Sequence, residues 1–178
     1  MNKEVLYDAK RFNVVKITGD NKIDTTGIEF ETDNVIVFPY TLDRNGNLEY
    51  VGIINEANNL RKNGFSDTVV SGTVEENETF LQCAKRELLE ETGYNVEENE
   101  KWNYCGKISA TKACATLHPC FLVDISNLTQ QKIKGDGSKG EKLSEFKLVK
   151  PSQIIKSTDA LVLTMLFKYF LINYHDIF

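Results

Sequence analysis

Apolar residues in the first part of the chain fall into short runs, which indicates β-strands. The runs alternate with polar residues or stay apolar throughout, and polar stretches separate them. Four of them come before residue 55: Phe12–Thr18, Ile28–Thr32, Val35–Leu42 and Leu48–Ile54. The last two flank the sequence Asp-Arg-Asn-Gly-Asn, whose Asn-Gly pair is typical of a hairpin turn. The first third of the chain is therefore predicted to be mostly strand.

Two later segments have the character of helices. The first runs from Thr79 to Thr92, where Thr79 and Gln82 have the spacing of a capping box and Gly93 follows as a terminator. The second, residues 160–174, is the most apolar stretch of the chain. It is shorter than a membrane span and contains Lys168, so we predict a buried helix and no membrane partner. Further strands are predicted at residues 68–74, 102–108, 118–125 and 146–149.

This order of elements predicts an α+β fold, in which helices cover both faces of a mixed β-sheet as an α/β/α sandwich. Strands dominate the chain, and the two substantial helices lie in mid-chain and at the end, which does not suit a doubly wound α/β fold. The length of 178 residues favours a single domain, residues 1–178. Hydrophobic residues at 41% and charged residues at 26% are ordinary for a globular protein.

Charge and cysteine content narrow the function classes. The formal net charge of -5 offers no general attraction to nucleic acid or anionic lipid, so a small-molecule partner is expected. No signal peptide is recognisable at the N-terminus, and four cysteines make no disulfide framework in a chain of this size, which favours the cytoplasm. Cys114, His118 and Cys120 lack a fourth ligand at zinc-site spacing, so zinc is not expected.

Carboxylates concentrate on one side of the first predicted helix. Glu87, Glu90 and Glu91 have i, i+3 and i+4 spacing, which brings their side chains into one sector of the helix. Leu81, Ala84 and Leu88 fall into another sector, which we expect to pack inward. Grouped hard oxygen ligands suit Mg²⁺ or Mn²⁺. By itself, this spacing also fits an acidic helix face in contact with solvent.

Additional residues at fixed positions favour the metal-binding interpretation. The motif is Gly, five residues, Glu, seven residues, Arg-Glu, an aliphatic residue, any residue, Glu-Glu, any residue, Gly and a bulky apolar residue. This chain fills it with Gly72, Glu78, Arg86, Glu87, Leu88, Glu90, Glu91, Gly93 and Tyr94. Residues 72–94 therefore resemble the signature box of the Nudix hydrolase family, in which Tyr94 replaces the usual aliphatic residue. The resemblance implies the Nudix fold, with a box helix and a C-terminal helix.

The resemblance also implies roles for the residues of the box. Glu87, Glu90 and Glu91 correspond to catalytic metal ligands, and the backbone carbonyl of Ser71 corresponds to a further ligand. The structural positions of the box are Gly72, Glu78, Arg86 and Gly93, and Glu78 and Arg86 are expected to hold the preceding loop on the helix by an ion pair. Arg86 also has the i,i+4 spacing of a simple helix-surface pair with Glu90.

Hydrolysis at phosphorus also requires a base that activates water. By resemblance to members that act on sugar nucleotides, Glu141 and Glu145 lie where a loop places the catalytic glutamate. We favour Glu141, because Glu145 can belong to the following strand. The alternative is that both glutamates are solvated loop residues.

The substrate is less clearly indicated than the reaction. Residues 1–33 resemble an extra segment that members acting on ADP-ribose and nucleoside diphosphate sugars carry, often to form a dimer, so a homodimer is expected. We therefore favour Mg²⁺-dependent pyrophosphatase activity on ADP-ribose or a nucleoside diphosphate sugar. The alternatives are a nucleoside triphosphate or dinucleoside polyphosphate hydrolase and a regulator that binds nucleotides without catalysis.

Overall fold

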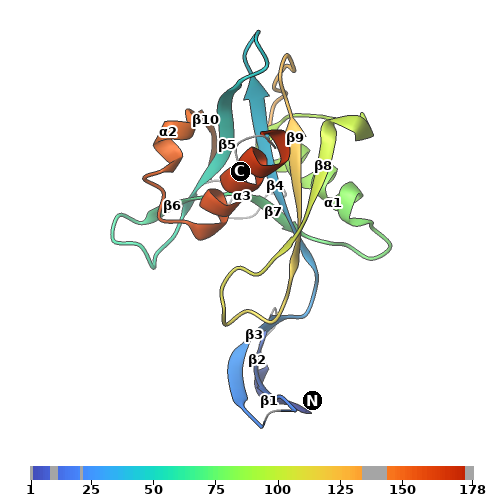
Figure 1. The fold of residues 1–178 in the computed structure, drawn as a ribbon, viewed down its shortest axis with the longest axis vertical. Helices are drawn as coiled ribbons and strands as arrows, with labels where there is room; N and C mark the ends of the chain where they lie inside the picture. Colours follow the sequence, from blue (N-terminus) through green and yellow to red (C-terminus); the bar gives the residue numbers. More distant parts are fainter. Residues whose placement is uncertain (1, 9–11, 21, 134–143, 175–178) are drawn as a thin grey trace.

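A mixed seven-stranded sheet forms the centre of the molecule (Figure 1). The structure is a computed structural model, and it describes residues 2–8, 12–20, 22–133 and 144–174. The main path of the sheet is β10-β5-β4-β9-β8, while β6 pairs with β5 and β7 with β4. β4 and β9 run parallel, and the other pairings are antiparallel. The strands are β4 Asn34–Leu42, β5 Leu48–Ala57, β6 Phe65–Thr68, β7 Val70–Thr73, β8 Trp102–Ile108, β9 His118–Asp124 and β10 Glu145–Val149.

The central strand β4 shows why the sheet needs a helix on each face. Val35 and Val37 are buried in the hydrophobic cluster that contains residues of α1 (Phe80–Thr92). Ile36 and Phe38 are buried in the opposite cluster, which contains residues of α3 (Ala160–Asn173). A strand covered on both faces must be apolar at consecutive positions, as this one is. The α/β/α sandwich predicted from the sequence is confirmed.

Helix α1 begins and ends at its predicted caps. The Thr79 side chain accepts a hydrogen bond from the Gln82 backbone, and the Gln82 side chain accepts one from the Thr79 backbone. Gly93 ends the helix with φ of 74°, a left-handed conformation that glycine adopts without a steric penalty. The inward face buries Cys83, Ala84 and Leu88. The sector of Glu87, Glu90 and Glu91 borders this buried face, so the Glu87 side chain is only 12% exposed.

The C-terminal helix α3 packs on the other face of the sheet, as predicted. It buries Val162, Met165, Leu166 and Tyr169, and the Asp159 side chain caps its first turn. Phe167 is exposed, whereas Tyr169 is buried against Tyr40. No helix in the described ranges is long and apolar enough to span a membrane. A short helix, α2 (Pro151–Ile154), and a 3-10 turn, η1 (Asn99–Lys101), complete the helical elements described.

The N-terminal segment forms a separate three-stranded antiparallel sheet, which extends from one end of the molecule (Figure 1). Its strands are β1 Asn2–Asp8, β2 Phe12–Thr18 and β3 Asp24–Phe30. The loop between β8 and β9 attaches this sheet to the body. The Ile28 amide donates to the Ala113 carbonyl at 2.6 Å, and the Ala115 amide donates to the Ile28 carbonyl at 2.7 Å. The N-terminal sheet is therefore held by a segment that lies more than eighty residues away in sequence.

Three features of the strand pattern differ from the prediction. β1 was not predicted, because it pairs on one side only and all of its residues are exposed, so no apolar period marks it. β3 covers residues 24–30 and not 28–32, since its pairing with β2 decides where it begins. The predicted strand 68–74 is divided between β6 and β7 at Val69, where the chain leaves β5 and joins β4.

Candidate active site

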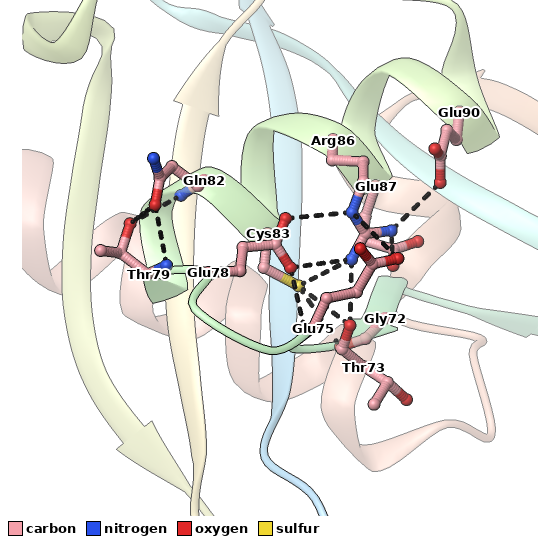
Figure 2. A network of polar contacts seen from close by, with 10 residues as sticks. All are labelled: Gly72, Thr73, Glu75, Glu78, Thr79, Gln82, Cys83, Arg86, Glu87 and Glu90. Atoms are coloured by element: carbon pink, nitrogen blue, oxygen red, sulfur yellow. Dashed lines mark hydrogen bonds and ion pairs between the residues drawn. The ribbon is translucent and has the colours of Figure 1, made fainter.

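Arg86 is the centre of the polar network on α1 (Figure 2). Its Nε atom donates to Oε1 of Glu78 at 3.0 Å, and its Nη2 atom donates to Oε2 of the same carboxylate at 3.0 Å. Nη2 also donates to the Thr73 backbone carbonyl at 3.0 Å. The planar guanidinium suits this paired geometry better than an ammonium group does. Arg86 thus joins strand β7, the loop after it and the box helix.

The remaining nitrogen of Arg86 faces the carboxylate cluster. Nη1 lies 2.6 Å from Oε1 of Glu87 and 3.2 Å from Oε2 of Glu90. The ion pair with Glu78 and the i,i+4 pair with Glu90 are therefore both present. Glu75 also approaches, with its Oε1 atom 4.0 Å from Nε of Arg86, so one positive charge faces four carboxylates and the cluster keeps an excess of negative charge.

The pKa values of the carboxyls differ according to their surroundings. Hydrogen bonds from Arg86 lower the pKa of Glu78 below its ordinary value. Burial raises the pKa of Glu87, and this effect exceeds the opposing effect of Arg86. The Glu87 side chain is 12% exposed, so little water stabilises its charge. An additional cation near Glu87 would therefore stabilise the ionised form.

Gly72 makes room for the Glu87 carboxyl. Gly72 lies on β7 opposite Val35 of β4. A Cβ atom added to Gly72 would lie 1.8 Å from the Glu87 carboxyl carbon and 1.9 Å from its Oε1 atom. No side chain tolerates such an approach, so any other residue would displace this carboxyl. The glycine of the motif is thus explained by a close approach between a strand backbone and a helix side chain.

Two contacts of this site were not found from the sequence. The Thr73 carbonyl accepts from Arg86 as a backbone group, which no residue type signals. The Cys83 sulfur lies 3.5 Å from Nη2 of Arg86, and burial raises the pKa of this thiol to about 12. Cys83 precedes Arg86 by three residues, and this i,i+3 spacing on the helix was the available signal.

The structure describes most of the predicted site residues. Glu87, Glu90 and Glu91 lie on α1, and Ser71 lies on β7 next to Gly72. Glu141 lies outside the described residues. Glu145 is the first residue of β10 and pairs with Lys147 at 3.0 Å.

The donors around Gly72 fit a hard divalent cation by their chemistry. They are carboxylates, and such oxygen ligands suit Mg²⁺ or Mn²⁺. Glu87 is largely buried, and Arg86 does not fully offset the effect of burial on its pKa. Within the described ranges, however, no three His, Cys, Asp or Glu side chains are grouped closely enough to hold a metal ion. Arg86 lies between Glu87 and Glu90 in this arrangement. Metal binding at these donors would therefore require the carboxylates to turn from Arg86.

A comparison with protein families assigns the chain. The NUDIX domain matches residues 33–165, about three quarters of the sequence. The chain belongs to the Nudix family, whose box was predicted at residues 72–94. It is accordingly a hydrolase that acts on phosphorus-containing anhydrides.

Solved structures share the fold at low sequence identity. A crystal structure of an ADP compounds hydrolase matches with a TM-score of 0.63 and 16% identity, over 95% of this chain and 90% of that chain. A crystal structure of a mutT/nudix family protein from Listeria innocua matches with a TM-score of 0.55 and 20% identity, over 80% of this chain and 93% of that chain. At these identities the likeness establishes the fold. No curated protein matched the chain in a sequence search.

Proposed function

We propose that the protein hydrolyses the pyrophosphate linkage of ADP-ribose or another nucleoside diphosphate sugar, with Mg²⁺ or Mn²⁺ as cofactor. The observation that carries the proposal is the excess of carboxylates on α1, with Glu87 held against Gly72. Among Nudix substrates we favour an ADP-linked compound, because the solved structure of an ADP compounds hydrolase has a similar fold. The match to that structure covers 95% of this chain, so it extends into the N-terminal segment. This segment, residues 1–32, lies outside the matched NUDIX domain.

Glu87, Glu90 and Glu91 would hold the divalent cation, together with the backbone carbonyl of Ser71. A divalent cation at such a site stabilises negative charge on phosphate oxygens and lowers the pKa of a bound water. Arg86 would keep Glu78 and the preceding loop on the helix while the carboxylates serve as ligands. Gly72 would keep the Glu87 carboxyl next to the backbone of β7.

The proposal is tested by a hydrolysis panel in Mg²⁺. It contains ADP-ribose, other nucleoside diphosphate sugars, nucleoside triphosphates and dinucleoside polyphosphates, with products separated by chromatography. We expect a sugar nucleotide to yield a nucleoside monophosphate and a sugar phosphate. Glu91→Gln serves as the blank, since loss of a ligand charge should remove most of the activity while the fold is retained.

The other outcomes of the panel identify the alternatives. Release of pyrophosphate from a triphosphate would contradict the proposed substrate and identify a triphosphate hydrolase. Cleavage restricted to dinucleoside polyphosphates would identify that activity. If no compound is cleaved but a nucleotide raises the Tm, the protein is a regulator that binds nucleotides. Full activity of Glu91→Gln would contradict the proposed metal ligands.

We propose Glu141 as the general base. Glu141→Gln is expected to lower kcat by about 10²–10⁴-fold, the usual contribution of general acid–base catalysis. The increase in Tm caused by Mg²⁺ should remain, because this residue is not a proposed metal ligand. The matched control is Glu145→Gln on β10, which should retain wild-type kcat. An unchanged rate in Glu141→Gln would assign the base to another residue.

We also propose that the N-terminal sheet joins two copies of the chain. Tyr7 on β1 and Ile28 on β3 both lie opposite Val14 of β2, so they share one face of this sheet, and they are 62% and 40% exposed. Val5 and Leu6 on β1 are 51% and 49% exposed. A second copy would cover this apolar surface. We expect sedimentation of the full chain to give a dimer and Val5→Lys/Tyr7→Lys to give a folded monomer. A wild-type monomer at micromolar concentration would contradict this.

The cytoplasm remains the predicted compartment.

A further inference from the structure

Two cysteines face each other at one edge of the main sheet. Tyr104 pairs with Phe121 and Lys107 with Pro119, so Cys105 and Gly106 together lie opposite Cys120. This two-against-one arrangement is a β-bulge. The Cys105 thiol donates to the Cys120 carbonyl at 3.4 Å, and the two side chains also interact directly. Both belong to the α3 side of the sheet, where Cys120 is buried and Cys105 is partly buried.

The backbone at this position suits a disulfide. In a regular antiparallel pair the Cα atoms of opposite residues are about 4.5–5.5 Å apart, and at this bulge Cys105 shares with Gly106 the place opposite Cys120. Disulfides join cysteines whose Cα atoms are about 4.4–6.8 Å apart. The side chains of Cys105 and Cys120 lie in the same hydrophobic cluster, and the Cys105 sulfur already lies 3.4 Å from the Cys120 carbonyl oxygen.

The environment of Cys105 favours reaction with an oxidant. β8 is an edge strand and Cys105 is partly exposed, whereas Cys120 is fully buried. The Lys168 ammonium donates to the Cys105 carbonyl at 2.6 Å. The contact with the Cys120 thiol lowers the pKa of Cys105, burial opposes this, and the positive charge of Lys168 lowers it further. Cys105 is therefore the accessible thiol of the pair and the one that ionises more easily.

We propose that Cys105 and Cys120 form a reversible disulfide when the protein reacts with a peroxide. The Cys105 thiolate attacks one peroxide oxygen, the O–O bond breaks, and the proton released by Cys105 converts the departing hydroxide into water. Cys120 then attacks the sulfur of the resulting sulfenic acid, the S–O bond breaks, and a second water leaves with the Cys120 proton. Two thiols are oxidised and one peroxide is reduced to two waters.

The disulfide would close the loop between β8 and β9 at its base. This loop contains Ala113 and Ala115, which hydrogen-bond to Ile28 of the N-terminal sheet. It also contains Thr116, whose hydroxyl accepts from the Phe30 amide at 2.8 Å. Oxidation at the sheet edge would therefore restrain the segment that attaches the N-terminal sheet to the body.

The test is peroxide treatment of the folded full chain, followed by tryptic mapping without reduction. Cys105 lies in the peptide Trp102–Lys107, whereas Cys114 and Cys120 share the peptide Ala113–Lys132. Cys114→Ser is therefore the informative background, because a link between these two peptides then involves Cys120. We expect the linked pair, with loss of two hydrogens, to form with peroxide and to disappear with dithiothreitol.

Cys105→Ser in the same background should give no link between the peptides. It replaces a partly exposed side chain, so the comparison does not depend on a change at the buried Cys120. The proposal is wrong if Cys105 is oxidised to the sulfinic acid while Cys120 stays reduced. It is also wrong if peroxide links Cys105 to Cys83, which lies in the peptide Asn63–Lys85, or leaves both thiols free. None of these outcomes depends on the substrate that the enzyme hydrolyses.

Discussion

Glu87→Gln is expected to reduce activity by about 10²–10³-fold and to raise the Tm of the metal-free protein. Activity falls because glutamine removes a ligand charge where negative charge on phosphate must be stabilised. The Tm rises because burial makes the ionised Glu87 carboxyl costly, as its raised pKa indicates. The substitution would also leave Arg86 with three carboxylates, Glu75, Glu78 and Glu90. Hydrolysis rates and metal-free thermal unfolding measure the two effects.

The pH dependence separates this explanation from a change in packing. A carboxyl with a raised pKa stabilises the fold when protonated, and this contribution is lost as pH rises through the folded-state pKa. The Tm advantage of Glu87→Gln should therefore be present at neutral pH and disappear below about pH 4, where the wild-type carboxyl is also neutral. The exposed Glu76 provides the control, since Glu76→Gln should change neither Tm nor activity. A lower Tm for Glu87→Gln at pH 7 would contradict the prediction.

Arg86→Ala is expected to destabilise the protein by about 2–4 kcal/mol. The change leaves Glu78, Glu87 and Glu90 without their shared cation and removes the donor to the Thr73 carbonyl. Loss of one partner from a buried ion pair costs about 3–5 kcal/mol, and we expect less here because the Arg86 side chain is 25% exposed. Urea unfolding gives the change in the free energy of unfolding. Arg86→Lys should fall between Ala and wild type, because lysine keeps the charge without the planar fork.

The control for Arg86→Ala is an exposed ion pair. Lys147→Ala removes the partner of Glu145 on β10, where the two side chains are 39% and 70% exposed, and should cost under about 0.5 kcal/mol. Because Arg86 lowers the pKa of Glu78, that carboxylate stabilises the fold above its ordinary pKa. The difference between wild type and Arg86→Ala should therefore shrink as pH falls below about 4. A cost equal to that of Lys147→Ala at pH 7 would show that solvent screens the network.

The box helix was predictable because the signals that define it are local. Thr79, Gln82 and Gly93 lie within one segment and fix both ends of α1 by interactions between near neighbours. The spacing of Glu87, Glu90 and Glu91 then determines their common sector, since helical geometry is the same in every helix. The layered fold was predictable for a similar reason, because the continuous apolar run of β4 requires cover on both faces.

The tertiary structure decided the features that depend on residues distant in sequence. The contact between Gly72 and Glu87 requires β7 to lie against α1, and the facing of Cys105 and Cys120 requires a bulge between β8 and β9. The attachment of β3 to the loop through Ala113 depends on backbone groups, which every residue carries. Sequence alone thus determined the box, its helix and the order of layers, because neighbouring residues encode them. Strand register, contact distances and the excess charge around Arg86 arise only when separate segments pack together.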